Sequence, residues 1–528
     1  MSERLARPAA IALVGVLLVF PLGRLVFEAL FDAGPFDVLA RPGVRTAVFN
    51  SIWSSVAAAT LALLAGAALA YVTDRLRPVA GSALRAAVVA TLIIPPFVSA
   101  LSWQATFAPF GLLDDLTGLS LGWVEGRAGV VVVLAVNSAP LAFLIVAAAL
   151  RSSRAGDLDW SARAAGAGPG RVLRQVTIPL IRPALVGGWL VGFAAALSSF
   201  GVPIVLGSPA GFDTLTTRVF QAVAFSAQPG AFGEAVMLAT MLAGVALVVV
   251  VVSDAGIGRT TMLADERGPI PPTERAPAWA SLAAWTYVAV TLVVPLGGLV
   301  LRAVTKAIGL SAAPANWTLA NFSGSLDART WEAFGRSALL AATAAIIAVL
   351  VAGLFVHLER RGAARWGPAA LVMFAVPGTS VAIAMSIAYG RWLANTVLII
   401  VIAYVAKLLA LAHRPLSSAI AGLHANQTRA AAASGASPGR TLRRIVTPLM
   451  RPALVAGWLL VFVLAVHELT ISSLLHGPGT ETLAVVILDY QQIGDPTATA
   501  ALAVVLAGVV GAVALPLVWL QRAWQGTR

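Results

Sequence analysis

One segment occurs twice in this 528-residue chain: PLIRPALV at residues 179–186 and, with a single change, PLMRPALV at residues 448–455. The flanking Pro-Gly-Arg repeats with it, at residues 169–171 and 438–440, at the same offset of 269 residues. Shared hydrophobicity aligns alanine and valine runs with one another, but it does not produce a polar motif in one register. We therefore predict a tandem duplication, the kind of internal repeat that decides a fold.

The residues around this repeat have the composition of a membrane protein. Hydrophobic residues make up 59% of the chain and charged residues only 11%, about half or less of what a soluble domain carries. Apolar runs of about 20 residues, long enough to cross a bilayer, recur throughout. The twelve predicted spans are 8–26, 51–73, 86–113, 128–150, 183–212 and 235–253 in the first copy, and 276–301, 337–356, 366–390, 392–411, 452–466 and 496–520 in the second.

The duplication divides the chain into two halves. We expect a first six-span repeat over residues 1–253 and a second over residues 278–528, joined by a cytoplasmic linker, 254–277, rich in proline, glycine and charge. Residues 20–26 match 294–300, so we expect the first span to be retained and not cleaved as a signal peptide. Both copies begin on the same side of the membrane, so the repeats are parallel. The predicted fold class is an all-α polytopic membrane protein with about twelve transmembrane helices in two parallel six-helix repeats.

The distribution of charge predicts an orientation. The net charge is +13, and arginines gather in the loops at residues 75–85, 151–182, 357–365 and 414–451, whereas the carboxylates concentrate in the alternate loops. Cytoplasmic loops of membrane proteins carry the excess of Lys and Arg. We therefore expect a multi-pass protein of the bacterial cytoplasmic membrane with both termini cytoplasmic. Nucleic acid is not an expected partner, because these arginines flank spans and form no basic face with base-contacting groups.

Two of these loops, residues 151–182 and 414–451, share a pattern of small residues, glycine and proline. The small residues indicate a short helix that stops at a glycine, which permits the left-handed turn that ends a helix. Thirteen residues later a proline opens the next span, a position in the first helical turn that proline suits. The candidate residues are Ser161, Ala162, Ala165, Gly166, Ala167 and Pro179 in the first loop, and Ala430, Ala431, Ser434, Gly435, Ala436 and Pro448 in the second.

The two loops resemble the signature of the permease subunits of binding-protein-dependent ABC importers: Glu-Ala-Ala, three residues, Gly, nine residues, then Ile-x-Leu-Pro. Both copies keep the spacing from glycine to proline and have small residues at the alanine positions. The glutamate is replaced by Trp160 and Arg429, and Asp157 and Asp159 are candidates to substitute for it in the first copy. The alternative interpretation is a pair of amphipathic connector helices lying on the membrane.

The resemblance covers nearly the whole chain and implies a type I ABC importer permease, in which each loop docks as a coupling helix on a separate ATPase. It implies two copies of an ABC ATPase subunit, an extracytoplasmic substrate-binding protein, and no cofactor on this chain, with ATP and Mg held by the ATPase. The residues support an ATPase in trans, because a phosphate-binding loop requires Gly-Lys-Ser/Thr. The only two lysines, Lys306 and Lys407, do not follow a glycine. We predict a transport subunit with no catalytic residues.

Two matching segments follow the fifth and eleventh spans, and they resemble the outer-gate segments of the ferric-iron branch of this family, whose permeases are single chains of two fused halves. The pathway or gate candidates are Ser199, Phe200, Pro203, His467, Glu468 and Thr470. An ionisable residue in an apolar span suggests a role facing a cavity, and the alternative is a polar pair near the outer interface. Lys407 is expected to extend towards an interface. The five histidines form no pattern typical of a metal site, so none is predicted.

The predicted cargo is ferric iron, with thiamine or another small solute as the alternative, because thiamine permeases are also fused. A rival class is a secondary transporter driven by an ion gradient, which would need buried carboxylates as relays. Only Glu468 is placed for that role, and such a transporter has no need for the same loop twice. A membrane scaffold without transport activity also gives no reason for the duplicated loops.

Overall fold

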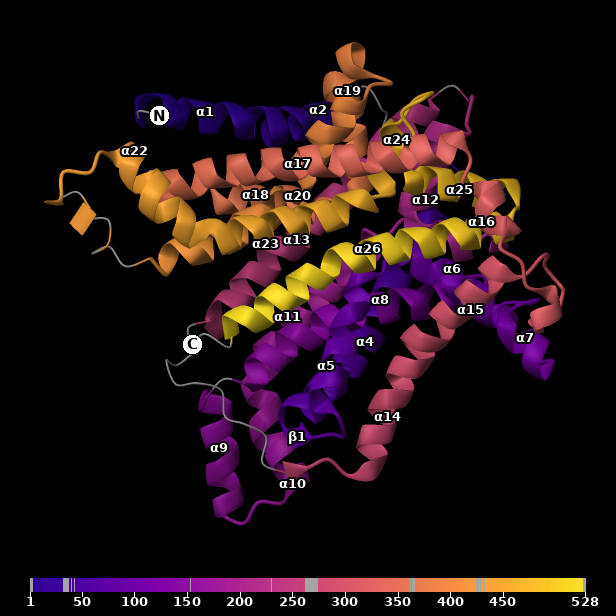
Figure 1. Ribbon diagram of the computed structural model, residues 1–528, viewed down its shortest axis with the longest axis horizontal. Coiled ribbons are helices and arrows are strands. Elements are labelled where there is room, and N and C mark those ends of the chain that lie inside the picture. Colours follow the sequence, from indigo (N-terminus) through magenta and orange to yellow (C-terminus); the bar gives the residue numbers. More distant parts are fainter. Residues whose placement is uncertain are drawn as a thin grey trace.

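Nearly all of the described chain is helical (Figure 1). The structure is a computed structural model that describes residues 3–31, 38, 40–41, 43–151, 153–228, 230–261, 274–360, 362, 366–423, 427, 430–431 and 433–525.

Ten described helices are long and apolar enough to cross a membrane, and the number of spans is twelve when each of two bent helix pairs is counted as one span. This confirms the predicted membrane architecture of about twelve helices. The ten are Ala6–Phe31, Val44–Asp74 (α4), Arg127–Leu150 (α8), Pro169–Leu197, Ala231–Val249, Ala278–Val304, Ala328–Arg360 (α17), Val397–Ala421 (α20), Gly439–Val466 and Pro496–Ala514. The fifth and eleventh spans contain α10 (Pro169–Val172) with α11 (Ile178–Leu197), and α22 (Pro438–Thr441) with α23 (Thr447–Val466).

The third span of each half is broken, which corrects the prediction of unbroken spans at 86–113 and 366–390. In the first half α5 (Gly81–Ala90) and a short turn to Ile93 meet α6 (Pro96–Phe107) at 105°. In the second half α18 (Gly367–Ala375) meets α19 (Gly378–Leu393) at 104°. Proline disfavours helical backbone in the residue before it and lacks an N–H donor. The backbone is accordingly extended at Ile94 and Val376, the residues before Pro95 and Pro377, with ψ of 124° and 129°.

Each π turn in the described residues ends two residues before a proline. These turns are Gly15–Val19, Leu173–Thr177, Pro203–Gly207, Ala289–Val293 and Leu442–Val446. Within a helix the proline ring clashes with the carbonyl four residues earlier, and one wider turn relieves the clash. The helix therefore continues across Pro179 and Pro448. Both spans begin about a turn or more before these prolines, at Pro169 and Gly439, which corrects the prediction that the prolines open them.

The two halves exchange their first spans (Figure 1). The first span, α1 (Glu3–Val14) and α2 (Phe20–Phe31), packs against α17 and α19 of the second half. The seventh span, α14 (Ala278–Val288) and α15 (Val294–Val304), packs against α5 and α6 of the first half. Side chains of the broken spans donate to the backbone of these exchanged helices, Tyr389 Oη to Val16 O at 2.6 Å and Thr106 Oγ1 to Pro295 O at 3.2 Å. Each half is therefore completed by a helix from the other.

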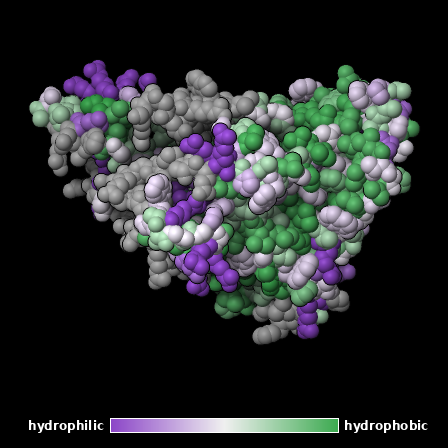
Figure 2. All heavy atoms as spheres, turned by 90° about the horizontal axis from the view of Figure 1, so that it is seen from below, coloured by the Kyte–Doolittle hydropathy of each residue, from purple (hydrophilic) through white to green (hydrophobic). Residues whose placement is uncertain are grey.

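The molecule has two distinct ends (Figure 1). One end, called the α9 end here, carries α9 (Ser153–Ala164), α10 and α22; the opposite end, the α7 end, carries α7 (Leu112–Thr117), α16 (Ala320–Ser325), α24 (Thr470–Leu475) and α25 (Leu483–Ile493). The helices of the two halves diverge towards the α9 end and converge towards the α7 end. Seen from below, hydrophobic side chains cover a broad part of the surface and hydrophilic ones form patches beside it (Figure 2). This exposed apolar surface is what a bilayer requires.

The junction between the halves is described in part. The sixth span belongs to α13 (Ala231–Thr261), which continues into the predicted linker, while residues 262–273 lie outside the described residues. Two-residue strands then pair in parallel, β1 (Leu76–Arg77) with β2 (Glu274–Arg275), and attach the start of the second half to the loop after α4. The last span lies in α26 (Pro496–Gln525). The domain boundaries at 253 and 278 stay a prediction.

Candidate functional site

The first loop helix, α9, ends in a Schellman turn at Gly166. Gly166 has a φ of 88°, and its N–H donates to Arg163 O at 2.9 Å, while Ala167 N–H donates to Ala162 O at 3.0 Å. These two bonds satisfy carbonyls that the end of a helix leaves free, and they need a residue at positive φ. The helix therefore ends at the glycine that the sequence indicated.

The second loop has the same turn. Gly435 has a φ of 75°, Ala436 N–H donates to Ala431 O at 3.0 Å, and Ser434 N–H donates to Ala430 O at 3.0 Å. Arg429, which replaces the signature glutamate, lies outside the described residues. Both loops thus present the same local geometry at the α9 end.

The candidate loop residues differ in exposure. Ser161, Ala165, Gly166, Ala430, Ser434 and Gly435 are exposed, and Ala162, Ala167, Ala436 and Pro448 are half-buried, while Pro179 is exposed on its span. Ala431 is only 8% exposed and packs inward. Trp160, at the position of the signature glutamate, is 65% exposed. The free surface of α9 therefore offers an aromatic side chain where the resembled family offers a carboxylate.

Asp159 anchors α9 to two other elements of its own half. It is 8% exposed, its Oδ1 accepts from Thr177 Oγ1 at 2.9 Å, and its Oδ2 lies 3.2 Å from Arg75 Nη2. Burial lowers the pKa of the Arg75 guanidinium, and the Asp159 carboxylate opposes that change. Both oxygens are used within the chain, so Asp159 does not replace the signature glutamate as a contact for a partner. The side chain of Asp157 lies outside the described residues.

One carboxylate at the end of the second span of the first half ties its helices together near the α9 end. Asp74 Oδ1, at the end of α4, lies 2.6 Å from Arg85 Nη1 on α5 and 3.3 Å from Arg151 Nε after α8. The carboxylate thus joins the second span, the first arm of the broken span and the end of the fourth span.

The second half uses a different pair for the same connections. Glu359 Oε1, at the end of α17, accepts the N–H groups of Trp366 and Gly367 at 2.7 and 2.8 Å, and its Oε2 lies 3.1 Å from His413 Nε2 on α20. The carboxylate thereby caps the N-terminus of α18, where free N–H groups favour an anion. His413 is therefore a structural partner of Glu359.

Lys407 points at the break in the ninth span. Its Nζ donates to the carbonyl oxygens of Phe374 and Val376 at 2.6 and 2.5 Å. These carbonyls lie at the end of α18, where the helix leaves acceptors without partners. This corrects the expectation that Lys407 extends towards an interface, because its ammonium group is used inside the protein.

Glu468 lies on the other side of this break. Its Oε2 accepts the N–H groups of Ile471 and Ser472 at 2.7 and 3.3 Å, so it caps α24. A Cβ added at Gly378, the first residue of α19, would lie 3.1 Å from Thr470 Cβ and 3.4 Å from Glu468 Oε1. The break is therefore held between one cation and one carboxylate.

Two further side chains complete this cluster. Tyr404, fully buried on α20, shares a 2.5 Å hydrogen bond with Ser472 Oγ. His467 is buried, and its Nδ1 has no hydrogen-bond partner among the described residues. Glu468, Thr470 and His467, predicted as gate candidates, thus lie on one segment against α19 and α20.

The first half has the same arrangement without charges. Its segment packs against the start of α6, because a Cβ on Gly201 would lie 2.6 Å from Phe97 Cβ. Phe200 is buried, with its ring centroid 5.1 Å from that of Phe220, and Pro203 is buried at the start of a π turn. Ser199 corresponds to Glu468 at the repeat offset, and its Oγ has no partner in the part of the chain that the structure describes. The predicted candidates therefore lie at two corresponding places rather than in one cluster.

Sequence reasoning gave the wrong surroundings for two residues. It placed Lys407 at an interface and Asp159 in contact with a partner protein, whereas both bind groups within the chain. A lone lysine inside an apolar span was a signal for the first, because intramembrane charges face the protein interior. No sequence signal identifies the partners of Asp159, since Arg75 comes from another loop and Thr177 lies 18 residues further along its own loop. Among the described residues no group of three or more histidines and carboxylates could hold a metal ion.

Residues 62–255 and 344–525 each match the family model of the binding-protein-dependent transport system inner membrane component. The two matches cover most of the chain, one in each half. The chain belongs to this family of permeases. The permease is therefore a multi-pass inner-membrane subunit of an importer, and membership implies a substrate-binding protein and an ATPase as partners.

Three relatives show the range of cargo among similar proteins. The ferric transport system permease protein of Actinobacillus pleuropneumoniae is 23% identical over 544 residues, which covers 97% of this chain and 77% of the relative. A putative ferric transport system permease protein of Haemophilus influenzae is 23% identical over 86% of this chain and 75% of its own length. The putrescine transport system permease protein PotI of Escherichia coli K12 is 32% identical over 213 residues, 39% of this chain and 70% of the relative.

Proposed function

We propose that this permease carries ferric iron across the membrane in an ATP-driven importer. The observation that carries the proposal is the pair of identical loop turns at Gly166 and Gly435, both at the α9 end, in a chain whose two halves match the family. Similarity to ferric permeases along both halves supports iron as cargo. The alternative is another small solute, thiamine or a polyamine, and the relative named for putrescine favours the latter.

The partners follow from the duplicated loops. Each loop docks on one ATPase subunit, so two copies bind at the α9 end, and ATP and Mg are held there and not by this chain. The α9 end and both termini are then cytoplasmic, in agreement with the arginine-rich loops. The extracytoplasmic binding protein docks at the α7 end. The exposed Trp160 contributes apolar contact in the first docking site, where a carboxylate is missing.

The fifth and eleventh spans connect docking to the candidate gate. One continuous helix runs from Pro169 to Leu197 and ends next to Ser199, and another runs from Gly439 to Val466 and ends next to Glu468. A displacement of the loop helices therefore reaches the gate segments along the helix axes. ATP-driven closure of the ATPases would move the two halves relative to each other and change which side of the membrane the pathway faces.

The gate itself is proposed at the two broken spans. The second half holds its break with Lys407 and Glu468, and the first half has only neutral side chains at the corresponding segment. A charge in a membrane interior is stable only while the groups that hydrogen-bond to it stay in place. Movement of α23 would displace Glu468 from the break that Lys407 holds. The second half therefore supplies the charged side chains of the proposed gate.

Uptake in proteoliposomes tests the cargo. The permease is reconstituted with its ATPase and binding protein, and radioactive ferric iron, putrescine and thiamine are supplied in turn. We expect ATP-dependent uptake of iron only. Uptake of putrescine or thiamine without iron would reject the ferric assignment while leaving the importer class intact.

A further inference from the structure

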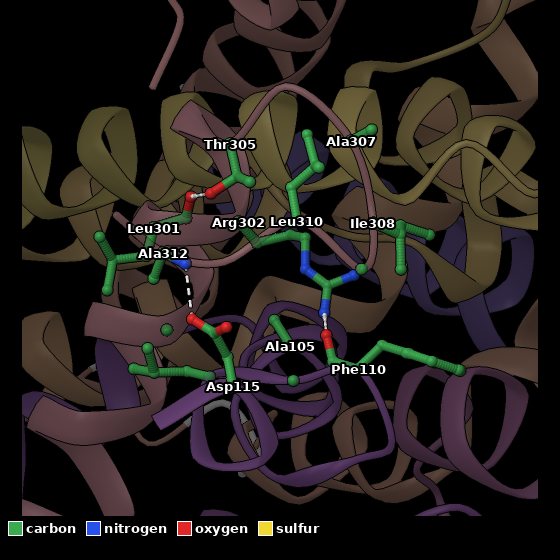
Figure 3. A pocket seen from close by; sticks show the side chains of 14 residues that line it. Ala105, Phe110, Asp115, Leu301, Arg302, Thr305, Ala307, Ile308, Leu310 and Ala312 are labelled. Carbon is green, nitrogen blue, oxygen red and sulfur yellow. Dashed lines mark hydrogen bonds between the residues drawn. The ribbon is translucent and has the colours of Figure 1, made fainter. Parts of the chain in front are cut away.

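A cavity of about 300 Å³, lined by apolar and polar side chains, lies at the α7 end, between the two halves. Its wall combines α6 of the first half with α15, α25 and α26 of the second. The polar side chains that line it are those of Gln104, Glu125, Arg302, Gln491 and Thr499. It adjoins the smaller pocket of Figure 3, in which Arg302 and Phe110 also appear. The cavity is separate from the candidate gate at Lys407 and Glu468.

This cavity contains one cation and one carboxylate that are not paired. Arg302 Nη2 donates to Phe110 O at 2.5 Å (Figure 3), and Glu125 Oε1 accepts from Gln104 Nε2 at 2.8 Å. Within the described residues neither charge forms an ion pair. The nearby Asp115 accepts the N–H of Ala312 and is not paired with Arg302 (Figure 3). A half-buried charge of each sign is therefore available to a ligand.

The amides complete the lining. Gln491 Nε2, from the second half, donates to Gln104 Oε1 of the first half at 3.2 Å. Gln104 in turn orients Glu125. The row of three side chains fixes the carboxylate from one side and leaves its second oxygen without a hydrogen-bond partner among the described residues.

The fold does not require this polarity. In the exchanged first spans Arg302 corresponds to Glu28, which is paired with Arg24 at 3.4 Å. Counted from the matching starts of α25 and α12 (Leu215–Ala224), Gln491 corresponds to Val223. The related position therefore lacks the unpaired cation and the amide of Gln491, so a role other than folding is indicated.

The surroundings of the cavity are those of a membrane boundary. The seventh span ends at Val304 and the twelfth begins at Pro496, so the cavity lies at the level where spans leave the hydrocarbon. Phe110 and Ile308, which line it, are 67% and 47% exposed. Charges next to exposed apolar side chains fit an amphiphile, whose headgroup enters the cavity while its chains lie along the spans.

We propose that this cavity binds the headgroup of an ethanolamine phospholipid. The guanidinium of Arg302 takes the phosphate, for which arginine offers paired donors. The carboxylate of Glu125 takes the primary ammonium, which has three N–H donors. The lipid thus bridges the two halves at the α7 end, whatever cargo the importer carries.

Native mass spectrometry of the purified permease tests this proposal. The protein is exchanged into phosphatidylethanolamine or phosphatidylcholine of identical acyl chains, and retained lipid is counted. We expect about tenfold tighter retention of the ethanolamine lipid, because choline has no N–H to donate and a charge-assisted hydrogen bond is lost. Glu125→Gln and Arg302→Gln should each abolish the preference, and Arg302→Lys should restore part of the binding.

Glu28→Gln is the matched control, because it alters the corresponding position of the other half and should leave lipid retention unchanged. Soluble phosphoethanolamine serves as the competing source of the same chemistry. Equal retention of both lipids, an unchanged preference in both cavity variants, or binding of soluble phosphoethanolamine without retention of the lipid would each overturn the proposal. Size-exclusion profiles like that of the unmodified protein show that the variants are folded.

Discussion

At the scale of single residues, the second half of this permease depends on a few charges placed inside the membrane. Lys407 donates to two carbonyl oxygens at the break of the ninth span, and Glu468 caps α24 beside it. Near the α9 end, Asp74 in the first half and Glu359 in the second half occupy corresponding places, and each joins helices of its own half. Lys407, Glu468 and Glu359 satisfy backbone groups that a broken or ending helix leaves free, and Asp74 binds the side chains of two arginines.

The substitution Lys407→Met should destabilise the protein. Methionine keeps most of the length of the side chain but leaves the carbonyls of Phe374 and Val376 without their donor, at a cost of about 1–3 kcal/mol. The midpoint of thermal unfolding in detergent should fall accordingly. Lys306→Met is the control, since Lys306 is exposed and donates to Ala315 O at a loop. A midpoint unchanged from that of the control would show that the carbonyls find other partners.

Replacement of Glu468 by glutamine should affect transport more than stability. The amide oxygen of glutamine still accepts the N–H of Ile471, so the cap on α24 remains, but the negative charge beside the break is lost. We expect uptake to fall about tenfold, equivalent to about 1.4 kcal/mol in the barrier, with the melting midpoint nearly unchanged. If uptake in proteoliposomes stays at the original rate, Glu468 is structural.

At the scale of elements, hydropathy and motif spacing predict which segments are spans but not their shape. The run at 86–113 is apolar throughout, so nothing in its length reveals the 105° bend that the prolines at 95 and 96 produce. Each π turn precedes a proline by two residues, but Pro140 and Pro415 lie inside α8 and α20 without one, so the prolines alone do not predict these turns. The Schellman turns at Gly166 and Gly435 were predictable, since their signal is local.

The anchoring of α9 gives a prediction at this scale. Asp159→Asn keeps an acceptor for Thr177 but removes the charge opposite Arg75, which stays half-buried without a counter-ion. We expect α9 to detach from α4 and the fifth span, so that ATP hydrolysis by the assembled transporter continues while uptake falls. Because the chain has no cysteine, a single cysteine at Ala162 reports the change as faster thiol labelling. Labelling at the original rate would contradict the anchoring role.

At the scale of the whole molecule, the two halves are completed by exchanged first spans. This feature could not be predicted from sequence, because both first spans have the same hydropathy and their partners lie in the other half. The duplication itself was evident from one polar motif, since only common descent places it twice in register. The partners of Asp159 and Lys407 likewise depend on tertiary packing. The spans, the loops and their turns could therefore be predicted from local sequence. The exchange of the first spans and the partners of Asp159 and Lys407 depend on tertiary contacts and could not.

The central claim is that the two loop turns couple this permease to its ATPase. Arginine at Gly166 and Gly435 forces a side chain into positive φ, at about 1–2 kcal/mol each, and places bulk on the exposed face of the loop. No atom lies within 4 Å of a Cβ at either position, so the spans should still fold. Gly118→Arg is the matched control, because Gly118 has a φ of 70° and open space at the α7 end.

Co-purification of the ATPase with the tagged permease is the most direct measurement. At equal membrane levels, the Gly118→Arg variant should retain the ATPase, whereas the double variant Gly166→Arg, Gly435→Arg should lose both the ATPase and iron uptake. Full ATPase recovery and uptake by the double variant would contradict the account, since the loops could not then be the coupling elements.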